Sequence, residues 1–474
     1  MSTELETDSA ISQFALNALA TGTSMALRVP RLRDYLIDRV LERVGDAYAE
    51  HSKPPEVKAE ERWLGRQLRP FLDRLLSERP AAARAIIRFL ITWTRDMARR
   101  RDGMARGRVM PTTVVIEPTA RCNFNCPGCY AKSTREGADL PYEQIETIVE
   151  QVIGMGVSLV TISGGEPFLR EKEDRTITRL AERFDDRGFL VYSNGALIDE
   201  EIADRLARVG NVFPAISVEG FEHQTDARRG KGVYAQNRSV RRMLAEREVL
   251  CGFSATVTRE NCEAICTDDF LDLRIEEGDM FGWFFLLQPI GRSPRPDLMV
   301  TARQRARLRE SIDRWRRRRR PVFLGDFWND GHLVDGCIAG GNGYFHIYAN
   351  GDISPCVFSP VACGNVFDIV RGKSEYESLD DFIQNNPVFR RFREEQAKIT
   401  DRARPCLLID HPDAIRRVAQ EEGCRPAKNM CPGYLDGEIA EGVDERAEEW
   451  RQLVPQLPPI GAQAEEAEEV RERA

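Results

Sequence analysis

Residues 121–130 read Arg-Cys-Asn-Phe-Asn-Cys-Pro-Gly-Cys-Tyr and follow the strand-like run Thr-Val-Val-Ile-Glu at 113–117. Cys122, Cys126 and Cys129 therefore have the spacing C-x3-C-x2-C within one loop. Three thiolates so spaced can bind three irons of a cubane iron–sulfur cluster and leave the fourth iron without a protein ligand. Such an open iron can bind a second molecule directly.

Two other interpretations of these cysteines fit less well. Structural zinc sites usually close four ligands from two separated pairs, whereas these three cysteines lie together in one short loop. A disulfide framework is less expected still, because 12 Cys in 474 residues is sparse for a secreted scaffold. In addition, Glu4, Glu6 and Asp8 stand where a signal peptide would be basic. The cysteines are predicted to be reduced metal ligands.

A second motif, Ser163-Gly164-Gly165-Glu166-Pro167, follows the apolar run at 159–162. Alone this motif is a common turn, but together with the cysteine loop it resembles the radical S-adenosylmethionine (SAM) superfamily. In that family the open iron of a 4Fe-4S cluster binds SAM, and one electron from the cluster cleaves it to a 5'-deoxyadenosyl radical. The resemblance implies an enzyme that abstracts hydrogen from an unactivated carbon. A non-catalytic iron–sulfur carrier or sensor is the alternative.

The resemblance places SAM at the ends of three neighbouring strands. Glycine backbone can approach a ligand closely, and Glu166 is expected to receive the SAM ammonium group. The turn after 189–192 would otherwise be an ordinary Asn-Gly turn. The residues assigned to SAM binding are Tyr130, Gly164, Gly165, Glu166, Pro167, Ser193, Asn194, Ser217 and Arg228.

Two positions depart from the family pattern. Glu219 stands where related enzymes usually have Asp. Gly128 precedes the third cysteine, where the family usually has an aromatic residue or His that packs on the adenine. We expect Tyr130 to take that packing role, with Phe124 as the alternative.

Six strand-like runs alternate with amphipathic helices, at 113–116, 159–162, 189–192, 215–218, 252–257 and 282–288. That alternation predicts an α/β fold with parallel strands and crossover helices. The resemblance implies an incomplete (β/α)6 barrel that is open on one side for the substrate. The apolar run at 283–287 would either line the substrate channel or form a strand covered on both faces.

A chain of 474 residues is expected to divide into about three units. We expect an N-terminal helical region at 1–108, the barrel at 109–330, a small auxiliary-cluster domain at 331–440 and an acidic tail at 441–474. The tail is expected to be a solvated helix or disordered.

The last third of the chain holds a second group of cysteines. Cys337 is followed by a hairpin-like stretch with an Asn350-Gly351 turn and then by Cys356. This pattern resembles the hairpin that opens the auxiliary-cluster domains called SPASM and Twitch. The resemblance implies one auxiliary 4Fe-4S cluster with the ligands Cys337, Cys356, Cys406 and, as the leading fourth, Cys431.

Other arrangements of these cysteines stay open. The fourth ligand could instead be Cys363, Cys424 or His411, or the fourth iron could face the substrate. The alternative to a cluster is a lid domain with unligated cysteines. Three cysteines of the barrel unit are given no role, namely Cys251, Cys262 and Cys266. Three tyrosines are candidate radical relays, namely Tyr234, Tyr344 and Tyr348.

The helix expected at 82–99 has a broad apolar face and is followed by several arginines. It could lie in a membrane surface, drawn to anionic headgroups. The favoured interpretation is a helix packed on the barrel with a solvated basic end. The basic run at 316–320 is likewise expected to be a solvated helix end, with a phosphate clamp as the alternative.

The net charge and the hydropathy of the chain exclude some classes of partner and location. The net charge of -8 argues against a general nucleic-acid binder. No apolar stretch is long enough to span a membrane, which predicts a cytoplasmic protein, with the inner membrane face as the alternative. The resemblance implies an external electron donor of the flavodoxin or ferredoxin type. The expected substrate is a lipid or other small hydrophobic molecule, and the alternative is a ribosomally made peptide.

Overall fold

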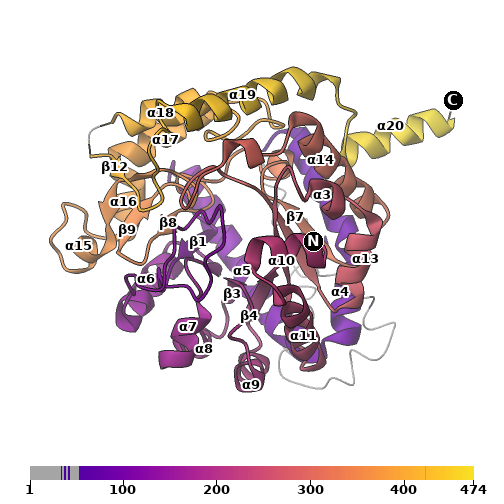
Figure 1. The fold of residues 1–474 in the computed structure, drawn as a ribbon, viewed down its shortest axis with the longest axis horizontal. Helices are drawn as coiled ribbons and strands as arrows, with labels where there is room; N and C mark the ends of the chain where they lie inside the picture. Colours follow the sequence, from indigo (N-terminus) through magenta and orange to yellow (C-terminus); the bar gives the residue numbers. More distant parts are fainter. Residues whose placement is uncertain (1–33, 35–36, 39–40, 43–52, 422, 474) are drawn as a thin grey trace, which may run out of the picture.

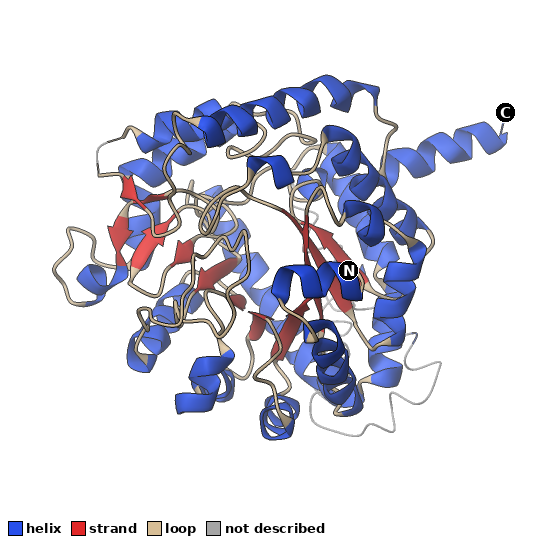
Figure 2. Ribbon diagram, in the orientation of Figure 1, coloured by secondary structure: helices blue, strands red, loops and turns tan. Residues whose placement is uncertain are grey.

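One ten-stranded sheet organises the chain in the computed structural model, which describes residues 34, 37–38, 41–42, 53–421 and 423–473 (Figures 1 and 2). The strand order is β11-β9-β8-β1-β2-β3-β4-β5-β6-β7. The strands are β1 Thr113–Ile116, β2 Leu159–Ile162, β3 Gly188–Ser193, β4 Val212–Ser217, β5 Gly252–Val257, β6 Phe281–Leu286, β7 Phe323–Asp326, β8 His346–Ile347, β9 Asp352–Ser354 and β11 Gly364–Asn365. A separate ribbon pairs β10 Val361–Ala362 with β12 Arg425–Pro426.

Helices cover the sheet, and further helices precede and follow the barrel in the sequence (Figure 1). The N-terminal ones are α3 Pro55–Gln67, α4 Arg69–Glu78 and α5 Pro80–Ala105. Those of the barrel are α6 Tyr142–Gly154, α7 Phe168–Asp174, α8 Thr176–Arg183, α9 Glu200–Val209, α10 Glu222–Arg229, α11 Val233–Glu246, α12 Cys262–Ile265, α13 Asp268–Glu276 and α14 Ala302–Arg317. The later ones are α15 Val366–Val370, α16 Leu379–Asn385, α17 Pro387–Ala397, α18 Pro412–Ala419, α19 Glu438–Leu453 and α20 Gly461–Arg473.

The strands from β1 to β7 are all parallel, so the α/β fold expected from the sequence is confirmed. All six strand-like runs form strands, and β7 is a seventh that the sequence analysis missed. β7 and β1 are not neighbours in the strand order, so the barrel is open between them. β8 pairs in parallel with the free edge of β1 and joins the hairpin region to the same sheet.

The two faces of the sheet pack against different helices, because successive side chains of a strand point to opposite faces. One face joins the large core formed with α6, α8, α9, α11, α13 and α14. The other face joins a second core formed with the N-terminal helices α4 and α5. The second core includes Leu72, Leu75, Ile86, Ile87, Leu190, Phe213, Ala215 and Phe281. α4 and α5 therefore cover part of this second face.

The apolar face of α5 packs against the sheet, as the favoured interpretation of this helix predicted. A buried polar contact fixes the helix there, because Asp96 accepts hydrogen bonds from Ser158 Oγ at 2.9 Å and from the Arg187 guanidinium. No helix in the described ranges is long and apolar enough to cross a membrane.

We expect Asp96→Ala to lower the free energy of unfolding by about 3 kcal/mol, because it removes the buried partner of Arg187 and leaves only the 3.4 Å pair with the more exposed Asp186. Urea unfolding of the wild type and the variant measures this difference. Asp185→Ala is the matched control, since Asp185 pairs with Arg88 of the same helix in an exposed position. That control should change the free energy by less than about 1 kcal/mol. Equal effects of the two substitutions would contradict the docking role of Asp96.

The basic run at 316–320 lies among carboxylates rather than forming an open phosphate clamp. Arg316 pairs with Asp330 at 2.7 Å, and Arg318 pairs with Asp268 at 2.7 Å. Arg320 also pairs with a carboxylate, that of Asp272. Because these guanidinium groups are paired with carboxylates, they are not free to bind a phosphate.

The segment expected to be a solvated acidic tail is partly packed. α19 runs along one edge of the molecule beside α18 (Figure 1) and buries Val443, Ala447 and Trp450. The Arg305 guanidinium lies 4.3 Å from the centre of the Trp450 ring. The tail interpretation is therefore wrong for α19, since apolar residues at helical spacing give it a packed face.

Candidate active site

Cys122, Cys126 and Cys129 lie partly exposed on the loop that follows β1. Backbone hydrogen bonds fix the loop, with Cys122 N donating to Thr134 O at 2.7 Å and Lys132 N to Cys129 O at 3.2 Å. Burial, then the Glu166 carboxylate and the nearby thiols of Cys129 and Cys126, raise the pKa of Cys122 to about 12. The backbone N–H of Phe124 points at Cys122 Sγ from 3.4 Å.

Three thiols on one loop are the kind of donor set that an iron–sulfur cluster takes. In the part of the chain that the structure describes, no three His, Cys, Asp or Glu side chains are grouped so as to hold a metal ion. A cubane needs a wider spacing than a single ion, because each thiolate binds a different iron. Soft sulfur donors that receive N–H hydrogen bonds suit iron–sulfur chemistry.

The two glycines of the second motif let the cysteine loop pack onto the end of β2. A Cβ on Gly165 would lie 1.8 Å from Arg121 O, and one on Gly164 would lie 2.7 Å from Thr119 O. Gly164 also has φ +108°, which side chains other than glycine rarely adopt. Gly165 N and Glu166 N donate to Thr119 O and Arg121 O at 2.9 and 2.8 Å. The motif therefore holds the cysteine loop in place.

Glu166 joins the ends of β2 and β3 and is fully buried. Its Oε1 accepts from Ser193 Oγ at 2.8 Å and from Phe168 N at 3.1 Å, and its Oε2 accepts from Asn194 N at 2.8 Å. Pro167 caps the start of α7 beside it. Burial raises the pKa of Glu166 to about 7, although these hydrogen bonds act to lower it. The contact between Glu166 and the SAM ammonium stays a prediction.

The raised pKa of Glu166 predicts a stability that depends on pH. Its folded-state pKa lies above the value in the unfolded chain, so its contribution is fully present below about pH 4.5 and is lost as the pH rises through 7. Relative to Glu166→Gln, the unfolding free energy of the wild type should fall by roughly 2–3 kcal/mol between pH 5 and 8. Urea titrations of both apoproteins across this range measure the difference. A difference that does not change with pH would contradict the assignment.

The turn after β3 connects to the cysteine loop. Asn194 Nδ2 donates to Asn123 Oδ1 at 2.8 Å and lies 3.9 Å from Cys122 Sγ. Ser217 Oγ, at the end of β4, donates to Ser193 O at 3.0 Å. The structure thus brings the ends of the first four strands together around the three cysteines.

Glu219, which stands where related enzymes usually have Asp, binds two arginines. Its buried carboxylate accepts from Arg228 Nη1 at 2.7 Å and from Arg229 Nη2 at 2.6 Å. Arg228 in turn directs Nε and Nη2 at Pro127 O and Gly128 O, both at 3.4 Å. Arg228 therefore lies against the cysteine loop, and the Glu219 carboxylate holds both arginines.

One loop residue of this site, Arg292, was missed by the sequence analysis. Arg292 Nη1 donates to Cys126 O at 3.1 Å, and its backbone N donates to Cys129 O at 2.9 Å. Gly291 permits this approach, since a Cβ there would lie 2.2 Å from Cys129 O. The Gly-Arg pair shortly after β6 was the available signal.

Tyr130 points its ring at Phe358, with 5.3 Å between the ring centres. Burial, then the nearby Glu117 carboxylate, raise the pKa of its phenol. Its packing on an adenine stays a prediction. Phe358 also contacts Phe285 of β6 and Trp328, at 6.4 and 5.1 Å between ring centres. Aromatic rings therefore link the cysteine loop, β6 and the hairpin region.

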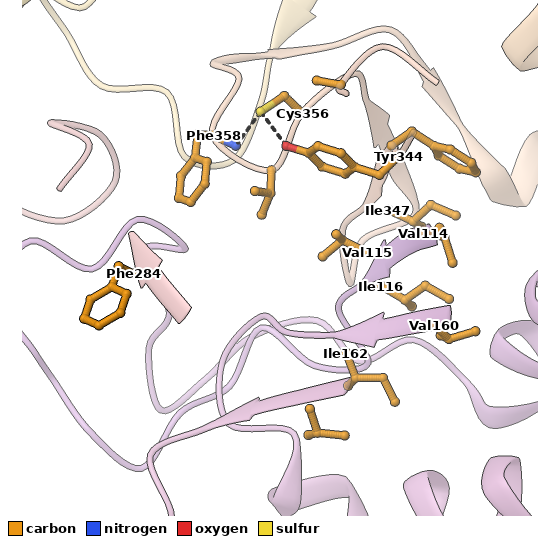
Figure 3. Close-up of a cluster of buried hydrophobic side chains, with 14 of the residues drawn as sticks. Val114, Val115, Ile116, Val160, Ile162, Phe284, Tyr344, Ile347, Cys356 and Phe358 are labelled. Atoms are coloured by element: carbon orange, nitrogen blue, oxygen red, sulfur yellow. Dashed lines mark hydrogen bonds between the residues drawn. The ribbon is translucent and has the colours of Figure 1, made fainter. Parts of the chain in front are cut away.

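The hairpin cysteines gather beside this aromatic group. Figure 3 shows the Tyr344 hydroxyl and Phe358 N both directed at Cys356 Sγ, at 2.9 and 3.4 Å. Burial raises the pKa of Cys406, and Asp410, Cys337 and Cys356 raise it further. Cys337 and Cys356 are therefore near enough to Cys406 to affect its pKa, and the role of the three thiols as cluster ligands stays a prediction.

Cys431, the predicted fourth auxiliary ligand, is buried like Cys356 and Cys406. Burial raises the pKa of Tyr434, and the nearby thiols of Cys406, Cys356 and Cys431 raise it further. Cys431 Sγ itself lies 3.6 Å from Pro289 O. Cys431 remains the predicted fourth ligand.

The residues proposed as alternative fourth ligands of the auxiliary cluster contact other parts of the chain. Cys363 and Cys424 flank the paired residues of β10 and β12, and burial, then Cys424, raise the pKa of Cys363. His411 Nε2 lies 2.9 Å from Arg404 O. Cys262 Sγ and Cys266 Sγ are buried in the barrel core 3.7 Å apart.

Comparisons with known proteins agree with this geometry. The family model of the radical SAM superfamily matches residues 116–261, and the SPASM model, an iron–sulfur cluster-binding domain, matches residues 337–407. The mycofactocin maturase MftC of Mycolicibacterium smegmatis is 28% identical, over 75% of this chain and 88% of MftC. The AdoMet-dependent heme synthase of Methanosarcina barkeri is 24% identical, over 60% of this chain and 86% of that protein.

A third relative and a solved structure extend the comparison. The PqqA peptide cyclase of Granulibacter bethesdensis is 25% identical, over 69% of this chain and 85% of the cyclase. The crystal structure of native anSMEcpe with bound AdoMet and the Kp18Cys peptide superposes with a TM-score of 0.51 at 17% identity. It covers 73% of this chain and 98% of anSMEcpe, which shows a shared fold. The relatives are enzymes, so the carrier alternative is set aside. The chain belongs to the radical SAM superfamily of enzymes and carries a SPASM iron–sulfur domain.

Proposed function

We propose that this radical SAM enzyme modifies a peptide by abstracting hydrogen from one of its carbon atoms. The observation that carries the proposal is the similarity to MftC and to the PqqA peptide cyclase, over 88% and 85% of their lengths. The proposal replaces the lipid that the sequence analysis placed first. That preference rested on the helical N-terminal region and on the basic patches. The apolar face of α5 packs against the sheet, and Arg316, Arg318 and Arg320 pair with carboxylates.

The site residues have separate roles in this proposal. Cys122, Cys126 and Cys129 would hold the SAM-binding cluster, and Glu166 orients the β2 and β3 turns toward it. When bound, the reduced cluster and SAM together supply a 5'-deoxyadenosyl radical. Cys337 and Cys356, with Cys406 and Cys431, would hold the auxiliary cluster. The site thereby positions a substrate between two sets of cysteines.

The aromatic residues between the two cysteine sets would keep water away from a radical. Phe285 lies at the centre of this group, 5.5 Å from the Tyr192 ring and 5.4 Å from the Phe327 ring. Excluding water prevents side reactions of a reactive intermediate. Such a surface also favours a second candidate, a flat hydrophobic substrate of the tetrapyrrole class, in keeping with the similarity to a heme synthase.

Formation of 5'-deoxyadenosine in response to added substrate tests the proposal. The reconstituted, dithionite-reduced enzyme receives SAM and, in separate anaerobic reactions, the peptide, lipid or tetrapyrrole fraction of an extract from its native host. The peptide fraction should raise the rate above the substrate-free rate, and protease treatment of that fraction should remove the increase. Cys126→Ala is the control for background formation. A response to the lipid or tetrapyrrole fraction alone would overturn the peptide assignment.

A further inference from the structure

We infer that the basic side chains around the cysteine loop form a docking surface for a small acidic one-electron carrier protein. This surface, called here the cationic rim, consists of Lys132, Arg135, Arg292 and the pair Arg228–Arg229. The inference rests on the proposed function, because SAM cleavage needs one electron from outside the chain.

The cysteine loop reaches the protein surface at this rim. Asn125 and Pro127 are exposed, and the cysteines beside them are partly exposed. Arg292 and Arg228 contact backbone oxygens of the loop, and Lys132 and Arg135 follow it with exposed side chains. An electron carrier seated on the rim would therefore approach the loop without passing through the substrate side of the barrel.

The rim keeps its positive charge. Within the described ranges no ion pair engages Lys132, Arg135 or Arg292, whereas Arg121 beside them pairs with both Asp139 and Glu173. Arg228 and Arg229 share the single carboxylate of Glu219 and so leave one positive charge. Two negative charges lie nearby, one on exposed Glu136 and one left over where Arg121 faces both Asp139 and Glu173, and the four positive charges of the rim exceed them.

This charge is opposite in sign to that of the chain, which is -8 overall. On an acidic protein, a basic patch attracts an acidic partner, and the rest of the surface repels it. Transient electron-transfer complexes bury little surface, so their association depends strongly on such steering. Salt screens exposed charges, with a Debye length of about 8 Å at physiological ionic strength.

The test compares two charge-reversal variants with equal changes in net charge. Lys132→Glu/Arg135→Glu changes the rim. Arg101→Glu/Arg106→Glu is the control, since these exposed residues lie near the end of α5, where Arg99 contacts Gly154 O. That end of α5 is close to the start of β2, whereas the cysteine loop follows the end of β1.

The measurement is the anaerobic rate at which a reduced acidic flavodoxin bleaches the visible absorbance of the reconstituted clusters. At low salt the rim variant should be reduced about tenfold or more slowly than the wild type, and the control variant at the wild-type rate. The difference should disappear at high salt, where dithionite should reduce all three proteins equally.

The outcomes separate the inference from the proposed function. A rim variant that flavodoxin reduces at the wild-type rate in low salt would overturn the docking surface. Equal slowing of both variants would overturn it too, because net charge alone would then explain the effect. A wild-type protein that dithionite reduces but that cleaves no SAM would instead overturn the proposed function.

Discussion

Cys126→Ala should abolish SAM cleavage, with formation of 5'-deoxyadenosine falling to the level seen without protein. The substitution removes one of the three thiolates that would hold the cluster with the open iron, and the loop offers no other sulfur in its place. Mass spectrometry of the nucleoside after anaerobic reduction measures the effect.

The matched control for this result is Cys356→Ala, which makes the same chemical change at the other set of cysteines. That variant should still form 5'-deoxyadenosine from SAM. Loss of SAM cleavage in both variants would show that the two sets do not act separately. Full SAM cleavage by Cys126→Ala would show that the cysteine loop takes no part in the reaction.

Cys356→Ala should also lower the iron content from about eight to about four atoms per chain, since one cubane cluster is lost. Cys356 has the contacts expected of a ligand, with a buried thiol that meets Phe358 N and the Tyr344 hydroxyl. Substrate modification should stop, although SAM cleavage persists. Iron analysis and product mass spectrometry check the two parts of this expectation.

Cys251→Ala is the control for the iron measurement, because Cys251 is a fully buried core residue of the barrel. It should retain about eight irons per chain. Retention of about eight irons in Cys356→Ala would contradict an auxiliary cluster at this position.

Local patterns predicted the parts of the fold that depend on neighbouring residues. The six strand-like runs all became strands, because each combines apolar residues with flanking turn signals. β7 was not predicted, because its sequence, Phe-Leu-Gly-Asp, is short and contains a glycine and a charged residue. Its strand state depends on pairing with β6, which the local sequence does not encode.

Contacts between distant segments limited the prediction of the site. Arg292 reaches Cys126 O from a loop 166 residues further along the chain, and no local pattern specifies such a contact. Glu166 was assigned to a ligand from its motif, whereas the structure shows hydrogen bonds to the turn after β3.

The N-terminal helices illustrate the same limit. The apolar face of α5 indicated burial, but its partner could not be read from the helix itself. Leu190 and Phe213 supply that partner surface from strands on the other side of the cysteine loop in sequence. Because an apolar face suits a membrane or a sheet equally, the partner decides between the two.

Electron paramagnetic resonance of the reduced protein, recorded with and without SAM, shows whether the cluster expected at Cys122, Cys126 and Cys129 has an open iron that binds SAM. SAM should change the signal of one reduced 4Fe-4S cluster, and Cys122→Ala/Cys126→Ala/Cys129→Ala should lose that signal while keeping the auxiliary one. A wild-type spectrum that SAM leaves unchanged would mean that no open iron of this cluster binds SAM.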